Sequence, residues 1–140
     1  MRYTVERINV RVATIDDKPG VLGAALAPLA EAGANLEFVL ARRAERGKAL
    51  VFVAPIKGAP QGRAARGAGF ETTDELEALR IEGPDKKGLG AMIAQALGDA
   101  GVNLRGFSAM ALGKRVVAYV AVDSKQDAAK GRRVLTKVLR

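Results

Sequence analysis

The stretch that decides the fold is "DKPGVLGAALAPLAEAGANL", which runs from Asp17 to Leu36. It begins with a Pro-Gly pair, and Pro19 suits the first turn of a helix. Gly33 fits the left-handed position just past a helix end. Between them, apolar residues recur at the spacing of one helix face: Val21, Leu22, Ala25, Leu26 and Leu29. The stretch therefore predicts a loop, an amphipathic helix and the entry into a strand.

The same pattern returns 68 residues later as "DKKGLGAMIAQALGDAGVNL", which begins at Asp85. Without a gap, eight of the twenty aligned positions are identical, and most of the others exchange one small or apolar residue for another. Self-similarity at a fixed spacing indicates an internal repeat. We therefore expect two copies of one unit, the first over residues 1–75 and the second over residues 76–140.

Both copies follow the order strand, helix, strand, strand, helix. In the first copy, alternation from Val5 to Ile15 predicts one strand, and residues 36–40 and 49–55 predict a hairpin. Residues 59–69 make a poor helix because they hold three glycines, and residues 70–73 suit a short edge strand. The second copy repeats this order over residues 75–139, with Asp123 or Ser124 as the cap of its last helix, but without a fourth strand. The expected fold is α+β, with two tandem ferredoxin-like βαββαβ repeats whose antiparallel sheets carry helices on one face.

The composition excludes several classes of enzyme. The chain of 140 residues has 49% hydrophobic residues, enough for a core, but it contains neither Cys nor His. Thiolate nucleophiles, histidine bases and histidine metal sites are therefore excluded. The glycine-rich and lysine-containing motifs that bind nucleotide phosphates are also missing. We expect no catalytic residues, no metal and no cofactor, and hence a protein that is not an enzyme.

The formal net charge of +8 is scattered along the chain, with no run of five or six like charges. An RNA-binding module of the same topology is an alternative, and "RGKALVFV" lies on the appropriate strand. However, Lys48 and Leu50 stand where that motif requires aromatic residues, so nucleic acid is not the expected partner. The N-terminus shows no apolar signal core, and no apolar run is long enough to span a bilayer. We expect a cytoplasmic protein without a membrane partner.

The repeated loop is the candidate for ligand chemistry. In each copy an Asp precedes a Gly at a helix start, where free N–H groups and the helix dipole favour an anion such as a carboxylate. Asn35 and Asn103 begin the next strand and are expected close to this loop, where an amide can both donate and accept. Asp17 or Asp85 would face an ammonium group, so the set suits a free α-amino acid. The alternative is that these residues only form turns and helix caps.

The segment "DKPGVLGAALAPLAEAGANLEF" resembles the signature of the ACT domain family, which has an Asp-x-Pro-Gly loop, an apolar helix and an Ala-Gly-hydrophobic-Asn entry to the second strand. "GPDKKGLGAMIAQALGDAGVNL" is similar, with Lys87 at the usual proline, and "GRAARGAGFETT" resembles the second helix and fourth strand. The resemblance covers nearly the whole chain as a tandem pair. It implies regulatory domains that bind small ligands, usually amino acids, at interfaces between paired domains, and that control metabolic enzymes.

By this resemblance the ligand-binding residues are, in the first copy, Asp17, Gly20, Val21, Leu22 and Asn35, and in the second, Asp85, Gly88, Leu89, Gly90 and Asn103. Lys87 is expected to loosen the second loop and to add charge, which makes the first copy the stronger candidate. The implied partners are a free amino acid, a second copy of the chain in a homodimer, and a metabolic enzyme. A ligand-free interaction module, or a subunit that docks onto such an enzyme, stays open as the alternative.

Overall fold

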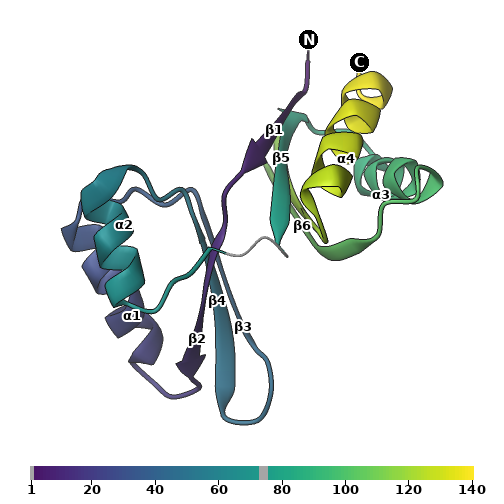
Figure 1. Ribbon diagram of the computed structural model, residues 1–140. Helices are drawn as coiled ribbons and strands as arrows, with labels where there is room; N and C mark the ends of the chain where they lie inside the picture. Colours follow the sequence, from purple (N-terminus) through teal and green to yellow (C-terminus); the bar gives the residue numbers. More distant parts are fainter. Residues whose placement is uncertain (1, 73–75) are drawn as a thin grey trace. The chain divides into compact units, whose positions relative to one another are not determined.

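The computed structural model describes residues 2–72 and 76–140, and the chain forms two compact units (Figure 1). One unit is Asn9–Thr73, and the other combines Met1–Ile8 with Asp74–Arg140. We describe each unit by itself. Both contain an antiparallel sheet with two helices, as the repeat predicts.

The unit of residues 9–73 contains the first copy of the repeated loop–helix stretch. Its elements are β2 (Arg11–Asp16), α1 (Val21–Glu31), β3 (Phe38–Arg43), β4 (Lys48–Ala54) and α2 (Gly58–Gly67). The sheet order is β2-β4-β3, and all pairs are antiparallel. Glu71 adds a short edge beside β2, because its backbone N–H and C=O bond those of Val12 at 2.9 and 3.0 Å. Of the short fourth strand expected at residues 70–73, the structure has a single bridge at Glu71, and residue 73 lies outside the described residues.

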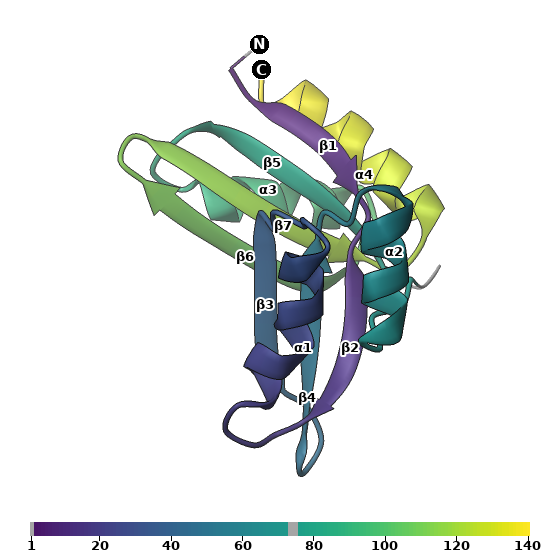
Figure 2. The same cartoon turned by 90° about the vertical axis from the view of Figure 1, so that its left-hand side faces the viewer.

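The helix α2 forms where the glycine content predicted a poor one. Gly62 and Ala65 are buried, so one face of this helix packs against the rest of the unit. Ala65 packs in one core cluster with Leu29 from α1 and Val51 from β4, and Phe70 closes the same cluster. Tertiary packing thus outweighs the weak local preference for a helix. Figure 2 shows α1 and α2 together over the β2–β4 strands.

The unit that contains the C-terminus has a complete four-stranded sheet. Its elements are β5 (Glu77–Pro84), α3 (Leu89–Asp99), β6 (Leu104–Leu112), β7 (Arg115–Val122) and α4 (Lys125–Val138). The fourth strand is β1 (Thr4–Ile8), which pairs antiparallel with β5 and gives the order β1-β5-β7-β6. As expected, Ser124 caps α4, and its Oγ accepts from Asp127 N at 3.0 Å. The core lies between the sheet and the two helices, around Leu79, Ile93 and Leu135.

The strand β1 corrects two expectations. The alternation from Val5 to Ile15 predicted one strand of the first copy, and the second copy was expected to lack a fourth strand. The structure has two strands there, separated by residues 9 and 10, and the first of them joins the sheet of the other unit. Residues 1–8 therefore belong with the second copy, unlike the expected division at residues 75 and 76. Alternation of apolar and polar residues predicts a strand but not the sheet that the strand joins, because side chains alternate with the same period of two in either sheet.

Candidate ligand site at the loop between β5 and α3

The two repeated loops have the same conformation. Gly20 and Gly88 each precede a helix with a positive φ, of 85° and 81°, which favours glycine. The residue after each glycine donates its N–H to a loop carbonyl, Val21 to Lys18 at 3.3 Å and Leu89 to Lys86 at 3.1 Å. Lys87 was expected to loosen the second loop; in the structure this loop has the same glycine conformation and the same backbone hydrogen bond as the first, with Lys87 in place of the proline.

The first turn of each helix leaves backbone donors unpaired. Neither α1 nor α3 has a side-chain cap, and the first N–H to bond back to the cap carbonyl is that of Ala24 or Met92. The second and third N–H groups of a helix have no partner inside it. In α3 these are the N–H groups of Gly90 and Ala91, which carry the positive end of the helix dipole and favour an anion.

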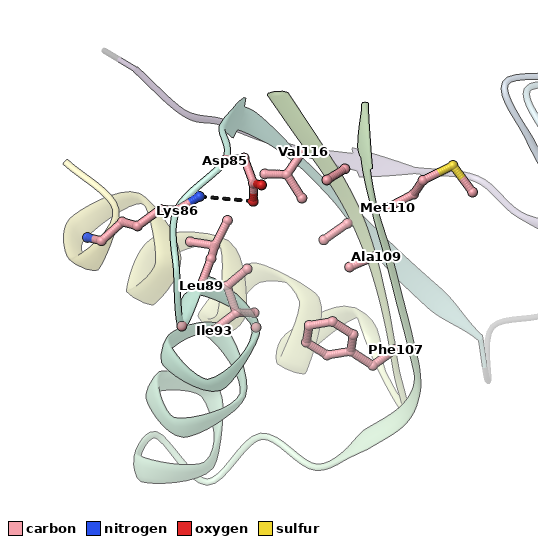
Figure 3. Close-up of a pocket in the computed structure, with 12 residues that line it drawn as sticks. Asp85, Lys86, Leu89, Ile93, Phe107, Ala109, Met110 and Val116 are labelled. Atoms are coloured by element: carbon pink, nitrogen blue, oxygen red, sulfur yellow. Dashed lines mark hydrogen bonds between the residues drawn. The ribbon is translucent and has the colours of Figure 1, made fainter. Parts of the chain in front are cut away.

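A pocket of about 240 Å³ opens beside the second loop (Figure 3). Figure 3 shows Leu89 and Ile93 on α3 facing Phe107 and Ala109 on β6, whereas Met110 points away from the helix. The start of α3 lies next to the aromatic ring, since a Cβ added at Gly90 would lie 4.0 Å from Phe107 Cζ. The floor of the pocket is apolar and is completed by Val116 and Ala118 of β7. The pocket thus joins an apolar wall to a helix N-terminus.

Asp85 supplies the acidic group of this pocket. Its backbone N–H donates to Lys114 O at 2.8 Å, which ties the loop to the β6–β7 turn. Its Oδ1 accepts from Lys86 N at 2.9 Å, and Figure 3 shows the Lys86 side chain pointing away. Across residues 2–72 and 76–140, no Lys or Arg side chain forms an ion pair with Asp85. Asp85 is exposed, and its carboxylate has no basic side chain as partner among these residues.

The corresponding carboxylate of the first copy is paired. Asp17 Oδ2 accepts from Arg43 Nε at 2.7 Å, and Arg43 lies on β3. The neighbouring Asp16 pairs with Lys48 at 2.7 Å. The Lys48 hydrogen bond and charge lower the pKa of Asp16, and the same contact raises the pKa of Lys48. Both acids at this loop thus have basic partners, whereas Gly20 and Leu22 are exposed around the helix start and Val21 is half-buried.

Asn35 and Asn103 do not lie beside the loops of their own copies, and that expectation is wrong. Asn103 precedes β6, whose first residue, Leu104, pairs with Val122 at one end of β7. Asp85 follows Pro84, which pairs with Arg115 at the other end of β7. The eight residues of β5 span about 25 Å at the usual strand rise. The helix carries the chain back along the sheet, so the next strand starts at the opposite end from the loop.

Sequence reasoning missed the apolar wall of the pocket. Phe107 and Ala109 were assigned only to a strand, and Ile93 only to the core face of a helix. Phe107 is one of the few aromatic residues, and 38% of its surface is exposed although its strand neighbours on β7 are buried. An aromatic residue near the middle of an edge strand, opposite a helix that starts with Gly-Leu-Gly, is the signal that could have pointed to it.

No family model matches the sequence, and no curated protein matches it significantly. Solved structures do resemble the model. The ligand-free regulatory subunit of aspartate kinase from Thermus thermophilus matches with a TM-score of 0.70 at 14% identity, over 100% of this chain and 98% of that one. A protein from Bacteroides thetaiotaomicron matches with a TM-score of 0.77 at 14% identity, over 95% and 89% of the two chains. Aspartokinase III of E. coli, in complex with aspartate and ADP, matches at 12% identity and a TM-score of 0.59, over 99% of this chain and 33% of the enzyme.

The fold is the α+β fold expected from the repeat, with two antiparallel sheets that each carry two helices, and the solved structures named above share it over most of this chain. At these identities the likeness concerns the fold. Two further findings apply to the part of the chain that the structure describes: none of its helices is long and apolar enough to cross a membrane, and no three acidic side chains gather where they could hold a metal ion.

Proposed function

We propose that this protein is a non-catalytic regulatory module of amino-acid metabolism that binds a free amino acid in the pocket between α3 and β6. One observation carries the proposal: an acidic group without a basic partner, unpaired helix N–H donors and an apolar wall converge on one small pocket. The likeness to regulatory subunits of aspartate kinase supports the same class of function.

The three parts of the pocket match the three parts of an amino acid. The carboxylate of Asp85 would receive the ligand ammonium, and the N–H groups of Gly90 and Ala91 would receive its carboxylate. The side chain would lie against Ile93 and Phe107. A volume of about 240 Å³ is below the usual range for drug-sized ligands and suits a small metabolite. The apolar wall favours an amino acid with an apolar side chain.

We propose that the pocket is completed in a homodimer formed through β6. This strand is a free edge of its sheet, and residues 106–112 carry no charge. Met110 and Leu112 are 70% and 83% exposed on it. A long, uncharged, apolar edge is normally paired or covered. Antiparallel pairing of two β6 strands would bring Asn103 of a second copy to the Leu112 end of the first, beside Asp85.

Docking onto a metabolic enzyme without any ligand is the second candidate. The aspartate kinase subunit that this chain resembles over almost its whole length is itself a regulatory subunit, and the same fold occupies a third of aspartokinase III. The exposed edge of β6 would serve such docking equally well. The two candidates differ in whether the pocket binds a ligand.

Titration calorimetry and thermal unfolding against the twenty amino acids test the proposal. We expect heat and a rise in Tm with at least one apolar amino acid. Asp85→Asn should weaken this binding about tenfold or more, because it removes the charge that pairs with the ammonium. Asp99→Asn is the matched control, since Asp99 lies at the far end of α3 and its Oδ1 accepts from Gln95 Nε2 at 2.9 Å. If none of the twenty amino acids gives heat or a Tm shift, the ligand-binding proposal is wrong and docking onto an enzyme without a ligand becomes the better candidate.

A further inference from the structure

The two copies can be superposed residue by residue from their strand registers. In the first copy β3 pairs with β4 so that Arg43 faces Ala49. In the second copy β6 pairs with β7 so that Ala111 faces Val116. The loop N–H groups of Asp17 and Asp85 bond the hairpin turns at Gly47 and Lys114, which places both loops at the same ends of their sheets. Arg43 and Ala111 therefore hold equivalent positions. Arg43 is the last residue of β3, and Ala111 is the last but one of β6.

This position decides what each loop carboxylate contacts. In the first copy Arg43 reaches Asp17 and holds its Oδ2 at 2.7 Å. In the second copy Ala111 lines the pocket with Asp85 and has no side chain beyond Cβ. The apolar wall also differs between the copies. Val39 holds the position on β3 that the aromatic Phe107 holds on β6. The loop backbones are alike, so the difference between the copies lies in these side chains.

We infer that Arg43 closes the first copy to an amino-acid ligand, so that the chain has one amino-acid site, in the second copy. This inference rests on the proposed function of the pocket. The guanidinium of Arg43, on a side chain that is 84% exposed, lies against the Asp17 carboxylate and pairs with it from within the chain, where a ligand ammonium would otherwise bind. A ligand would have to displace a side chain that is tethered to the same unit and would then meet its positive charge at close range. At Asp85 a ligand would neither displace a paired side chain nor meet its positive charge.

Exchanging the two residues tests the inference directly. Arg43→Ala removes the closing side chain, and Ala111→Arg introduces it into the second copy. Arg42→Ala is the control for the first change, because it removes the same charge from the neighbouring residue, which lies over the ring of Phe52. Leu112→Arg is the control for the second, since it adds the same charge one residue along β6, where side chains alternate between faces. Circular dichroism and thermal unfolding confirm that each variant is folded.

The readout is the number of sites per chain, measured by calorimetry with leucine, isoleucine, valine, methionine and phenylalanine as probes. We expect one site in the wild type and in Arg42→Ala, and two in Arg43→Ala. Ala111→Arg should weaken binding about tenfold or more, whereas Leu112→Arg should leave it within a factor of about two. Two sites in the wild type, one in Arg43→Ala, or an unaffected Ala111→Arg would overturn the inference and leave the proposed function standing. No binding of any probe to the wild type would overturn both.

Discussion

The ring of Tyr3, the residue before β1, lies directly over Gly83 on β5. A Cβ added at Gly83 would overlap the Cδ1 and Cγ atoms of that ring. The Tyr3 hydroxyl also donates to Pro84 O at 2.7 Å, and the Tyr3 ring is buried in the core of this unit. The contact fixes where the N-terminal strand docks and explains why a glycine stands inside β5.

Gly83→Ala should therefore destabilise this unit. We expect a loss of about 1–3 kcal/mol in the free energy of unfolding, as for other overpacked cores, measured by urea denaturation. Gly98→Ala is the control, since Gly98 lies exposed in α3 with open space around it and should gain about 0.5–1 kcal/mol. Adding Tyr3→Ala removes the ring, so Gly83→Ala should cost less in that background. An equal cost in both backgrounds would show that the ring is not what excludes a side chain.

Glu82 on β5 should contribute to acid sensitivity. Its Oε1 accepts from Arg80 Nη1 at 2.8 Å, and Arg115 lies 3.5 Å from its other oxygen. The Arg80 hydrogen bond and charge lower the pKa of Glu82, with a smaller effect from Arg115. Because the folded-state pKa is lowered, this stabilisation is present above the unfolded-state value and is lost as the pH falls through the folded value.

Glu82→Gln should reduce stability slightly at pH 7, by at most about 1 kcal/mol because the pair is partly exposed. The difference from the wild type should shrink as the pH falls below about 4.5, toward the lowered folded-state pKa, since the wild type then loses the same interaction. Urea midpoints between pH 7 and pH 3 measure this. Glu31→Gln is the control, because Glu31 is exposed at the end of α1 and is not part of the Arg80–Glu82 pair. Its stability relative to the wild type should not follow the pH dependence that the Arg80 contact gives to Glu82→Gln. A difference for Glu82→Gln that stayed constant across this range would contradict the prediction.

Ser124→Ala should destabilise α4 by about 1 kcal/mol, because it removes the cap that accepts from Asp127 N. Ser124→Asp keeps a side-chain acceptor at the same place and should retain most of the stability. Thermal unfolding compares the three proteins. If both variants lost the same amount of stability, the Ser124 hydroxyl would stabilise the protein through something other than capping.

Met110→Lys should weaken self-association if two copies pair through β6. Pairing would place the introduced charges near each other on residues 106–112, a segment that now carries no charge. Sedimentation velocity over a range of concentrations should show a shift toward monomer. Val138→Lys, at a 44% exposed position of α4, adds the same charge away from this edge and should leave the association unchanged. An equal effect of both substitutions would point to net charge rather than to the edge.

Most of the local structure could be predicted because it depends on residues close together in the chain. The alternation of the strands, the helical spacing after Gly20 and Gly88, and the cap at Ser124 all act within a few residues. The two loops share one turn conformation although Pro19 is replaced by Lys87, because both keep the glycine with a positive φ and the backbone hydrogen bond that follows it. The helix α2 was underestimated because its burial, not its propensity, stabilises it.

The sequence by itself determined that the chain holds two copies of one loop–helix unit and that each copy builds an antiparallel sheet with helices on one face. Only the tertiary structure decided that β1 joins β5, because alternation is the same for either sheet. It also decided that Arg43 pairs with Asp17 while Ala111 leaves Asp85 open, and that Asn103 starts its strand at the far end from Asp85. These facts depend on strand direction and register, which bring together residues that no local pattern connects.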